Sequence, residues 1–320
     1  MPAEALAGAG QDAAGLILGV GIATVDIVNL VAAYPAEDAE VRALVQRSVR
    51  GGNVANTLAV LRQLGRPCAW LGTIADDAGA ALIRDDLRGR GVALEHAVTV
   101  PGAGTPTSHI ALSRATGSRT IIHHRDLREL TAADFDAVPL DALAWLHFEG
   151  RNPPETARMI ERVRRERPEL PVSVEIEKPR DGLEVLLRGA GGGPGVLIFS
   201  RAYAAASART DAGPPAPAAF LRRREQDCDA DLLLLPWGAD GAYGLARGGE
   251  PVHVPAHAPA RVVDTLAAGD VFNALVIDGL LRGLALPALL ARANRVAGFK
   301  CGRDGLDGLI DEIVSAGIPL

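Results

Sequence analysis

Two short segments of the chain place polar and acidic side chains at the start of an expected helix, where chemistry on a ligand is possible. The first is Val263–Asn273, VDTLAAGDVFN, in which small residues lead into an apolar helix and Asp270 lies in its first turn. The amides of a helix start carry a partial positive charge that stabilises anions, and small residues let a ligand approach them. Asp270 can accept a proton from an attacking hydroxyl while the amides stabilise charge on a transferring phosphoryl group. On spacing alone, Asp270 could equally be a helix cap.

The second segment is Arg50–Asn56, RGGNVAN, where paired glycines precede another expected helix. Asn53 and Asn56 are three residues apart, so they share one face of the first helical turn. Their amide groups both donate and accept hydrogen bonds, as the hydroxyls of a polyhydroxylated ligand require. Taken alone, the pattern would more often be an asparagine cap after a tight turn.

The basic residues exclude one common phosphate-binding device. Of 33 lysines and arginines, only Lys178 and Lys300 are lysines, and no Gly-Lys pair occurs in the chain. The Walker loop requires Gly-Lys-Ser or Gly-Lys-Thr, whose lysine contacts the phosphates of a nucleotide. If the protein handles nucleotides, it does so without that loop.

Composition and charge favour a globular protein of the cytoplasm. The chain has 320 residues, of which 48% are apolar and 22% charged, with a formal net charge of −6. A chain of this length can bury a sizeable core without metal or disulfides. No basic cluster is interleaved with aromatic residues, which argues against a nucleic-acid partner, and no stretch has the roughly 18 apolar residues of a membrane span. Three scattered cysteines and an acidic N-terminus without a signal-peptide layout favour the cytoplasm.

Periodicity predicts a single doubly wound α/β domain over residues 1–320, with a mostly parallel sheet and helices on both faces. The expected strands are 16–22, 69–74, 144–148, 172–176, 196–200 and 231–235. The expected helices are 53–64, 77–90, 154–167, 182–188, 218–227, 268–283, 287–301 and 309–316. Two stretches rich in Gly, Pro and Ala, 189–195 and 207–219, are interpreted as surface loops because the strand–helix rhythm resumes after them.

A second, smaller sheet is expected from residues 25–50 and 105–125. The later segment has the pattern of a hairpin, two β-rich runs around a turn at 115–118. A sheet of that size needs a cover over its apolar face. We therefore expect a lid that closes over a site or packs on a partner subunit.

The two glycine-rich segments, in this order, resemble the signatures of the ribokinase-like (PfkB) carbohydrate kinases. The first signature is Gly51-Gly52-Asn53, and the second is Asp-Thr-x-x-x-Gly-Asp at 264–270. The resemblance covers about residues 16–310 and is closest to the ketohexokinase branch of the family. The strings that favour this branch are YPAED at 34–38, QR at 46–47, DLR at 86–88, EGRN at 149–152, SVE at 173–175, EKPR at 177–180 and KCG at 300–302.

The resemblance implies transfer of the γ-phosphate of ATP, as a magnesium complex, to the C1 hydroxyl of fructose or a close ketose. Asp270 would be the general base. The residues that match the sugar site are Asp26, Gly52, Asn53, Asn56 and Asp270. Those that match the ATP site are Arg119, Gly238, Ala239, Asp240, Gly241, Ala267, Ala268 and Gly269, with Lys178 as a secondary phosphate contact. The lid would clasp a second copy in a homodimer and carry Asp38 into the sugar pocket of the neighbouring subunit.

Two departures from the family pattern affect the expected chemistry. Ala267 stands where the family usually has the first glycine of its anion hole, so its methyl group would narrow the approach or change the backbone angle. The family's Asn-x-x-Glu, which organises magnesium-bound water, is replaced by Ser200–Tyr203, SRAY. The similar string Asn152–Glu155 lies elsewhere and is interpreted as the entry to a helix. Glu177 is then the candidate contact for magnesium, and a K⁺ requirement stays open.

Two alternatives stay open at this point. A related sugar or nucleoside kinase, such as a fructokinase acting at C6 or a ribokinase, would share both signatures. The departure at Ala267 also leaves room for a catalytically weak sugar- or nucleotide-binding sensor. Sequence does not determine which hydroxyl is phosphorylated, because that depends on small differences in placement relative to Asp270.

Overall fold

A nine-stranded sheet runs through the centre of the computed structural model, which describes residues 15–188, 192–207 and 216–320. Its order is β15-β14-β13-β12-β11-β10-β1-β4-β6. The interpretation of the N-terminal segment concerns residues outside the described ranges, and so do residues 189–191 and 208–215 of the two expected loops at 189–195 and 207–219. Residues 217–219 of the second expected loop belong to a helix. The parallel strands are β1 (Leu16–Val20), β4 (Cys68–Leu71), β6 (Val92–Ala93), β10 (Leu143–Glu149), β11 (Val172–Ile176), β12 (Val196–Phe199) and β13 (Leu232–Pro236).

Two antiparallel strands that the periodicity did not predict complete one edge of this sheet. They are β14 (Ala242–Ala246) and β15 (Val252–Val254), and they pair in a meander on β13. The strand expected at 69–74 is divided at Gly72, and its second part, β5 (Thr73–Ile74), pairs instead with β7 (Val98–Thr99). The sheet is therefore mostly parallel, as predicted, with an antiparallel edge.

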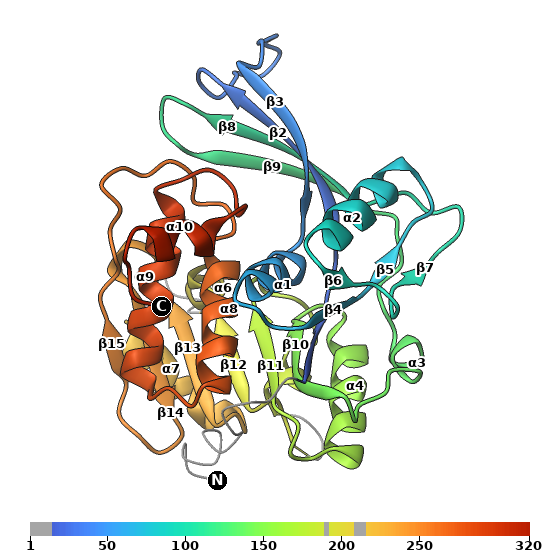
Figure 1. Ribbon diagram of the computed structural model, residues 1–320, viewed down its shortest axis with the longest axis vertical. Coiled ribbons are helices and arrows are strands. Elements are labelled where there is room, and N and C mark those ends of the chain that lie inside the picture. The colour runs from blue at the N-terminus through green and yellow to red at the C-terminus, as the bar shows by residue number, and fades with distance from the viewer. Residues whose placement is uncertain (1–14, 189–191, 208–215) are drawn as a thin grey trace.

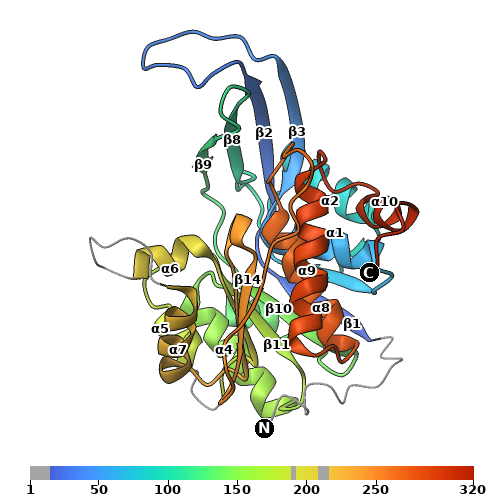
Figure 2. The ribbon, with the colours of Figure 1, turned by 90° about the vertical axis from the view of Figure 1, so that its left-hand side faces the viewer.

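Helices cover both faces of the sheet, because successive strand residues enter two different cores. Ile17 packs in the first core and Leu18 in the second. Figure 2 shows the two helical layers on either side of the strands. The first layer consists of α1 (Asn53–Gln63), α2 (Ala78–Gly89), α8 (Ala268–Leu281), α9 (Leu286–Cys301) and α10 (Leu309–Ser315). The second consists of α3 (Ala132–Phe135), α4 (Pro153–Glu166), α5 (Glu184–Arg188), α6 (Arg201–Ser207) and α7 (Pro217–Asp227). The predicted fold class is confirmed, and none of the helices in the described ranges has the length and apolarity to cross a membrane.

The expected small sheet is also present and stands away from the central body at the top of Figure 1. Its order is β3-β2-β8-β9, with β2 and β8 parallel and the outer pairs antiparallel. The strands are β2 (Thr24–Val31), β3 (Val45–Gly51), β8 (Thr107–Ser113) and β9 (Arg119–His124). Every residue of β9 is exposed, so the sheet has an open face.

The direction in which successive strands are added to the sheet reverses at β1, and this reversal indicates where a ligand would bind. From β1 the chain passes through β2 and β3 to β4 on one side, whereas β10 pairs with the other side of β1. In open α/β sheets, ligands bind beyond the carboxyl ends of the strands at such a switch point. The residues that follow or end these strands, among them Ile22 and Glu149, line a common cavity.

Helix α8 begins at a residue with an unfavourable backbone. Ala267 has φ 60° and ψ 8°, in the left-handed region. Of the described residues other than glycine, only Asp38, Asn152 and Ala267 have positive φ, and alanine lacks the polar side chain that helps Asp and Asn there. The alanine therefore takes the conformation of the glycine it replaces. Its methyl group packs partly against the first core, at a backbone cost of about 1–2 kcal/mol.

We expect Ala267→Gly to stabilise the protein. Relief of the left-handed strain exceeds the added chain entropy of glycine, so the free energy of unfolding should rise by about 0.5–1 kcal/mol in urea titrations. Ala268→Gly is the matched control, because the next residue is helical and should lose up to about 1 kcal/mol. A loss of stability in Ala267→Gly would contradict the strain.

Candidate active site

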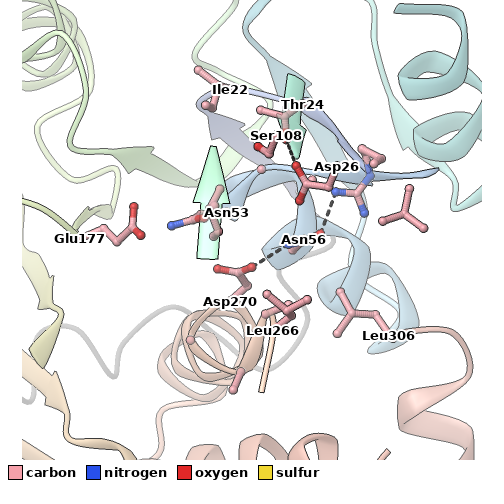
Figure 3. Close-up of a pocket in the computed structure, with 18 of the residues that line it drawn as sticks. Ile22, Thr24, Asp26, Asn53, Asn56, Ser108, Glu177, Leu266, Asp270 and Leu306 are labelled. Carbon is pink, nitrogen blue, oxygen red and sulfur yellow. Dashed lines mark hydrogen bonds between the residues drawn. The ribbon is translucent and has the colours of Figure 1, made fainter. Parts of the chain in front are cut away.

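A cavity of about 780 Å³ lies between the small sheet, the carboxyl ends of the central strands and the starts of α1 and α8. Figure 3 shows that Asp26, Asn53, Asn56 and Asp270 come together there from three separate parts of the chain. The sequence-predicted residues that line it are Asp26, Gly52, Asn53, Asn56, Arg119, Glu177, Lys178, Ala267, Ala268, Gly269 and Asp270.

A glycine and a buried carboxylate set the start of α1. Gly52 has φ 110°, and a Cβ there would lie 2.3 Å from the carbonyl oxygen of Ile22, so no other residue fits. Glu149, at the end of β10, accepts the backbone N–H of Ile22 at 3.1 Å and that of Val54 at 3.2 Å. The carboxylate therefore caps the helix and ties it to the segment that follows β1.

Asn53 is not a helix cap, because Gly52 occupies that position without a side-chain bond. Instead its Nδ2 donates to Glu175 Oε2 at 3.1 Å, across the cavity floor. Burial raises the pKa of Glu175 well above its ordinary value, and the nearby Asp270 and Glu149 add to the shift. Burial at this position therefore favours the neutral form of the Glu175 carboxyl, which can donate as well as accept a hydrogen bond.

Asn56 contacts the expected base directly. Its Nδ2 donates to Asp270 Oδ2 at 2.7 Å, and the neighbouring Thr57 hydroxyl donates to the Asp270 carbonyl oxygen at 3.2 Å. Asp270 makes no side-chain cap on α8, whose cap position is Ala267. The first turns of α1 and α8 are therefore linked directly by hydrogen bonds from Asn56 and Thr57 to Asp270.

Asp270 lies almost wholly buried, yet it borders the cavity. The pKa of Asp270 is raised to about 7, mainly by burial and further by the nearby Glu149 and Glu177. The hydrogen bond from Asn56 and the positive charge of Arg50 act in the opposite direction and lower the pKa. A carboxyl with such a pKa can both take and release a proton near neutral pH, as a general base must.

The residue before α8 and the first turn of that helix, residues 267–270, offer backbone N–H groups to a ligand, as any helix start does, and are called the amide cradle below. A Cβ built on Gly269 meets nothing within 4 Å, so free space lies against the backbone at the helix start. Arg119 reaches this loop from β9, with Nη1 donating to Thr265 Oγ1 at 3.3 Å. The fully buried Lys300 holds the loop from behind, with Nζ donating to the carbonyl oxygen and to Oδ2 of Asp264 at 2.9 and 2.7 Å. Amides, a guanidinium and free space together suit a phosphate.

Two predicted contacts do not line the cavity. Residues Gly238–Asp240 form a 3₁₀ turn just after β13, of which only Pro236 reaches the cavity wall. The need for glycine at position 241 is explained by local packing, since a Cβ there would lie 2.1 Å from the Val254 carbonyl oxygen. Asp38 is exposed in the loop between β2 and β3. Neither position meets the cavity of its own chain.

The metal candidate is Glu177, whose half-exposed side chain lines the cavity and lies 3.3 Å from Lys178 Nζ. Ser200–Tyr203, SRAY, contains no carboxylate. The Tyr203 N–H donates to Ser200 Oγ at 2.9 Å, and the tyrosine ring stacks on Phe199 in the core. Asn152 begins α4, as predicted. Within the described ranges, no three Asp, Glu, His or Cys side chains are placed to hold a metal. A single carboxylate suits magnesium bound mainly by nucleotide phosphates and water.

Sequence reasoning gave no role to Arg50, Glu149 or Glu175, although the two glutamates lie in strings that carry the resemblance and Arg50 directly precedes the first signature. All three side chains are buried and ionisable, and they line the cavity. For the two glutamates, the available signal was an acidic residue near or at the carboxyl end of an otherwise apolar strand, which is unusual for a buried strand.

Comparison with known proteins agrees with this geometry. The family described as pfkB family carbohydrate kinase matches residues 15–312. The chain is 37% identical over 301 residues to ketohexokinase from Mus musculus, covering 92% of this chain and 98% of that protein.

Solved structures agree on the fold. A putative ribokinase from Agrobacterium tumefaciens superposes with a TM-score of 0.78 at 20% identity, covering 94% of this chain and 97% of that one. The Arabidopsis thaliana ribokinase complexed with ribose and ATP gives 0.72 at 19% identity, covering 91% and 94%. A family match over nearly the whole chain, with both signatures meeting in one cavity, leads to one conclusion. The chain belongs to the pfkB family of carbohydrate kinases.

Proposed function

We propose that the protein is an ATP-dependent, ketohexokinase-like sugar kinase that phosphorylates fructose or a close ketose at C1. The observation that carries the proposal is the Asn56–Asp270 pair beside the amide cradle of one cavity, with a distance of 2.7 Å between its amide and carboxylate. The 37% identity to a mouse ketohexokinase supports the ketose as substrate. The similar Arabidopsis ribokinase is complexed with ATP, which supports ATP as the donor.

The sugar would lie between the small sheet and α1. Asp26, Gly52, Asn53 and Asn56 offer carboxylate, backbone and amide groups to adjacent hydroxyls. Asp26 Oδ1 already accepts the Thr24 hydroxyl at 2.8 Å, so its carboxylate is fixed before a sugar binds. Asp270 would then take the proton of the hydroxyl that attacks.

The phosphates would lie on the cradle. The amides of Ala267–Asp270 and the Arg119 guanidinium would bind the transferring group, and Lys178 lines the same cavity as a further cation. Bound magnesium, held by the phosphates with Glu177 near, would neutralise charge between the phosphate oxygens. The small sheet, as a lid of this single domain, would exclude water that competes as acceptor.

The first test is substrate-dependent turnover. Purified protein with ATP and magnesium should form ADP only when a suitable sugar is added, with fructose best in a panel of ketoses, ribose and nucleosides. Phosphorus NMR should place the product phosphate at C1. A product at C6, or a preference for ribose, would replace this proposal with another kinase of the family. Sugar binding by calorimetry without ADP would indicate a sensor.

Asp270→Asn should separate the chemistry from binding. Loss of the base should lower kcat by about 10²–10⁴ while sugar binding persists. In the native enzyme, kcat/KM should fall about tenfold per unit as pH falls below about 7, since only the carboxylate form of Asp270 acts. Unimpaired turnover in the variant would reject Asp270 as the base.

The same variant should gain stability in a pH-dependent way. The folded pKa of Asp270 lies above the unfolded one, so the native protein loses stability as pH rises from about 4 to about 7. Asparagine removes that loss, so urea unfolding should find the variant more stable at pH 8 by about 1–3 kcal/mol, with a smaller difference at pH 5.

We also propose that the small sheet packs on a second copy and that the reaction takes place in the cytoplasm. The small sheet and the loop before β3 expose the apolar side chains Tyr34, Val41, Leu44, Val45, Val49, Ile121 and Ile122. Val49 and Ile121 also line the cavity, whereas Ile122 is the next residue of β9 and points to the opposite face. Exposed apolar side chains beyond the cavity favour a protein partner. Asp38, in the same loop, would enter the partner's sugar pocket. Three free thiols, two of them buried, fit a reducing compartment.

Mixing two variants tests this assembly. Asp38→Asn, which tolerates the positive φ of 62°, should raise the KM for sugar, and Asp270→Asn should be inactive. Dimers that contain one subunit of each have one site with native Asp270 and a native Asp38 from the partner. In an equimolar mixture that assembles at random, about half of the dimers are of this kind, so about a quarter of the native activity should return when it is measured at sugar concentrations well below the KM of Asp38→Asn. No recovery, or a monomer in light scattering, would contradict the shared site.

A further inference from the structure

Arg50 directly precedes Gly51 and Gly52 and is buried at the edge of the cavity. Its guanidinium binds the Asp86 carboxylate directly and is linked to the Asp270 carboxylate through the side-chain amide of Asn56. Its side chain is only 2% exposed. Nε pairs with Asp86 at the end of α2, and Nη1 donates to Asn56 Oδ1 at 2.8 Å. The same Asn56 amide donates from Nδ2 to Asp270.

This chain of contacts fixes which way the Asn56 amide faces. A flipped amide would put Oδ1 against the Asp270 carboxylate and the NH₂ group against the guanidinium, and both contacts would be repulsive. Arg50 cannot lose its proton, so it always requires an acceptor from Asn56. The amide is thereby held with its donor facing Asp270 whether or not a ligand is bound.

We propose that Arg50 is a positioning residue: it locks the Asn56 amide so that the amide N–H always faces Asp270, which favours the carboxylate form of the base. This inference rests on the proposed role of Asp270. The cation acts through the intervening amide and does not itself need to touch the sugar or the phosphates.

The surroundings of Asp270 explain why such a device is useful. Glu149 from β10, with Glu175 and Glu177 from β11 and the turn after it, face the same cavity, and all three are acidic. Burial and the charges of Glu149 and Glu177 raise the pKa of Asp270, whereas Asn56 and Arg50 lower it. The amide and the arginine behind it are the two influences that favour the active form of the base.

Asp86 and Arg90 hold the arginine in turn. Arg90 Nε donates to both Asp86 oxygens at 3.0 Å, and Arg90 Nη1 lies 2.6 Å from Asp307 Oδ1. Arg90 therefore binds the same carboxylate as Arg50 but makes no hydrogen bond to Asn56 or Asp270. It provides a matched control with the same change of side chain.

The test is the pH dependence of kcat/KM. Arg50→Met should move the midpoint of the acid limb upward by about one pH unit, equivalent to roughly a tenfold loss of kcat/KM on that limb, because the amide is no longer held and the charge is gone. Arg90→Met should leave the midpoint where it is in the native enzyme. A purely structural role of Arg50 would lower kcat at all pH values alike. A midpoint that does not move in Arg50→Met overturns the proposal.

Arg50→Lys keeps the test usable if the methionine variant does not fold. Lysine keeps a charge beside Asp86, but one ammonium group does not reproduce the fork that serves Asp86 and Asn56 together. The midpoint should therefore rise here too, with thermal stability closer to native. An unshifted midpoint in a folded Arg50→Lys would equally overturn the proposal.

A double-mutant cycle separates the amide route from a direct effect of charge. In an Asn56→Ala background, Arg50→Met should cause a smaller shift than in the native background, because the amide that it positions is missing and only its direct charge effect on Asp270 is left to lose. Fully additive shifts would show that Arg50 acts only through space and would overturn the positioning role. Turnover retained in Asp270→Asn would instead reject the proposed base, so the two failures are distinguishable.

Discussion

The arrangement of this protein depends on burying several carboxylates around one cavity. Glu149, Glu175 and Asp270 are each less than a tenth exposed and come from three different elements. An isolated buried charge is very costly, so each group is either protonated or bound by donors. Glu149 accepts two backbone N–H groups, Glu175 accepts Asn53, and Asp270 accepts Asn56. Helix α1 supplies a donor to each of the three.

Helix α1 therefore does more than cover the sheet. The first turn of α1 can reach all three acids only because residue 52 is glycine. A Cβ on Gly52 would lie 2.3 Å from the Ile22 carbonyl oxygen, so the helix could not begin this close to that segment with any other residue. The glycines at 51–52 and the asparagines at 53 and 56 consequently act together. The glycines bring the helix start close, and the asparagines satisfy the acids that it then meets.

Sequence patterns predicted the parts of this site that are local and missed those made by distant packing. Asn53, Asn56 and Asp270 could be found because each lies in the first turn of a helix, which is visible in the pattern of glycine, polar and apolar residues. The partner of Asn56 is 214 residues away, and the buried pair of Arg50 depends on how α2 packs against β3. Periodicity carries no information on such contacts. The short edge strands β14 and β15 were missed for a related reason, since three to five residues give too few alternations.

Two features at the start of α8 reduce the stability of the fold: the left-handed backbone of Ala267 and the buried carboxyl of Asp270. Ala267 keeps a left-handed backbone that glycine would adopt without strain, and Asp270 remains buried although an amide in its place would not have to carry charge. A chain selected for stability alone would relieve both. The left-handed backbone at Ala267 lies beside free space at the start of α8, and the raised pKa of the buried Asp270 is what the proposed base requires near neutral pH. Because the left-handed shape is retained despite the methyl group, Ala267 is better explained as a tolerated cost within a working kinase site than as the sign of a lost activity.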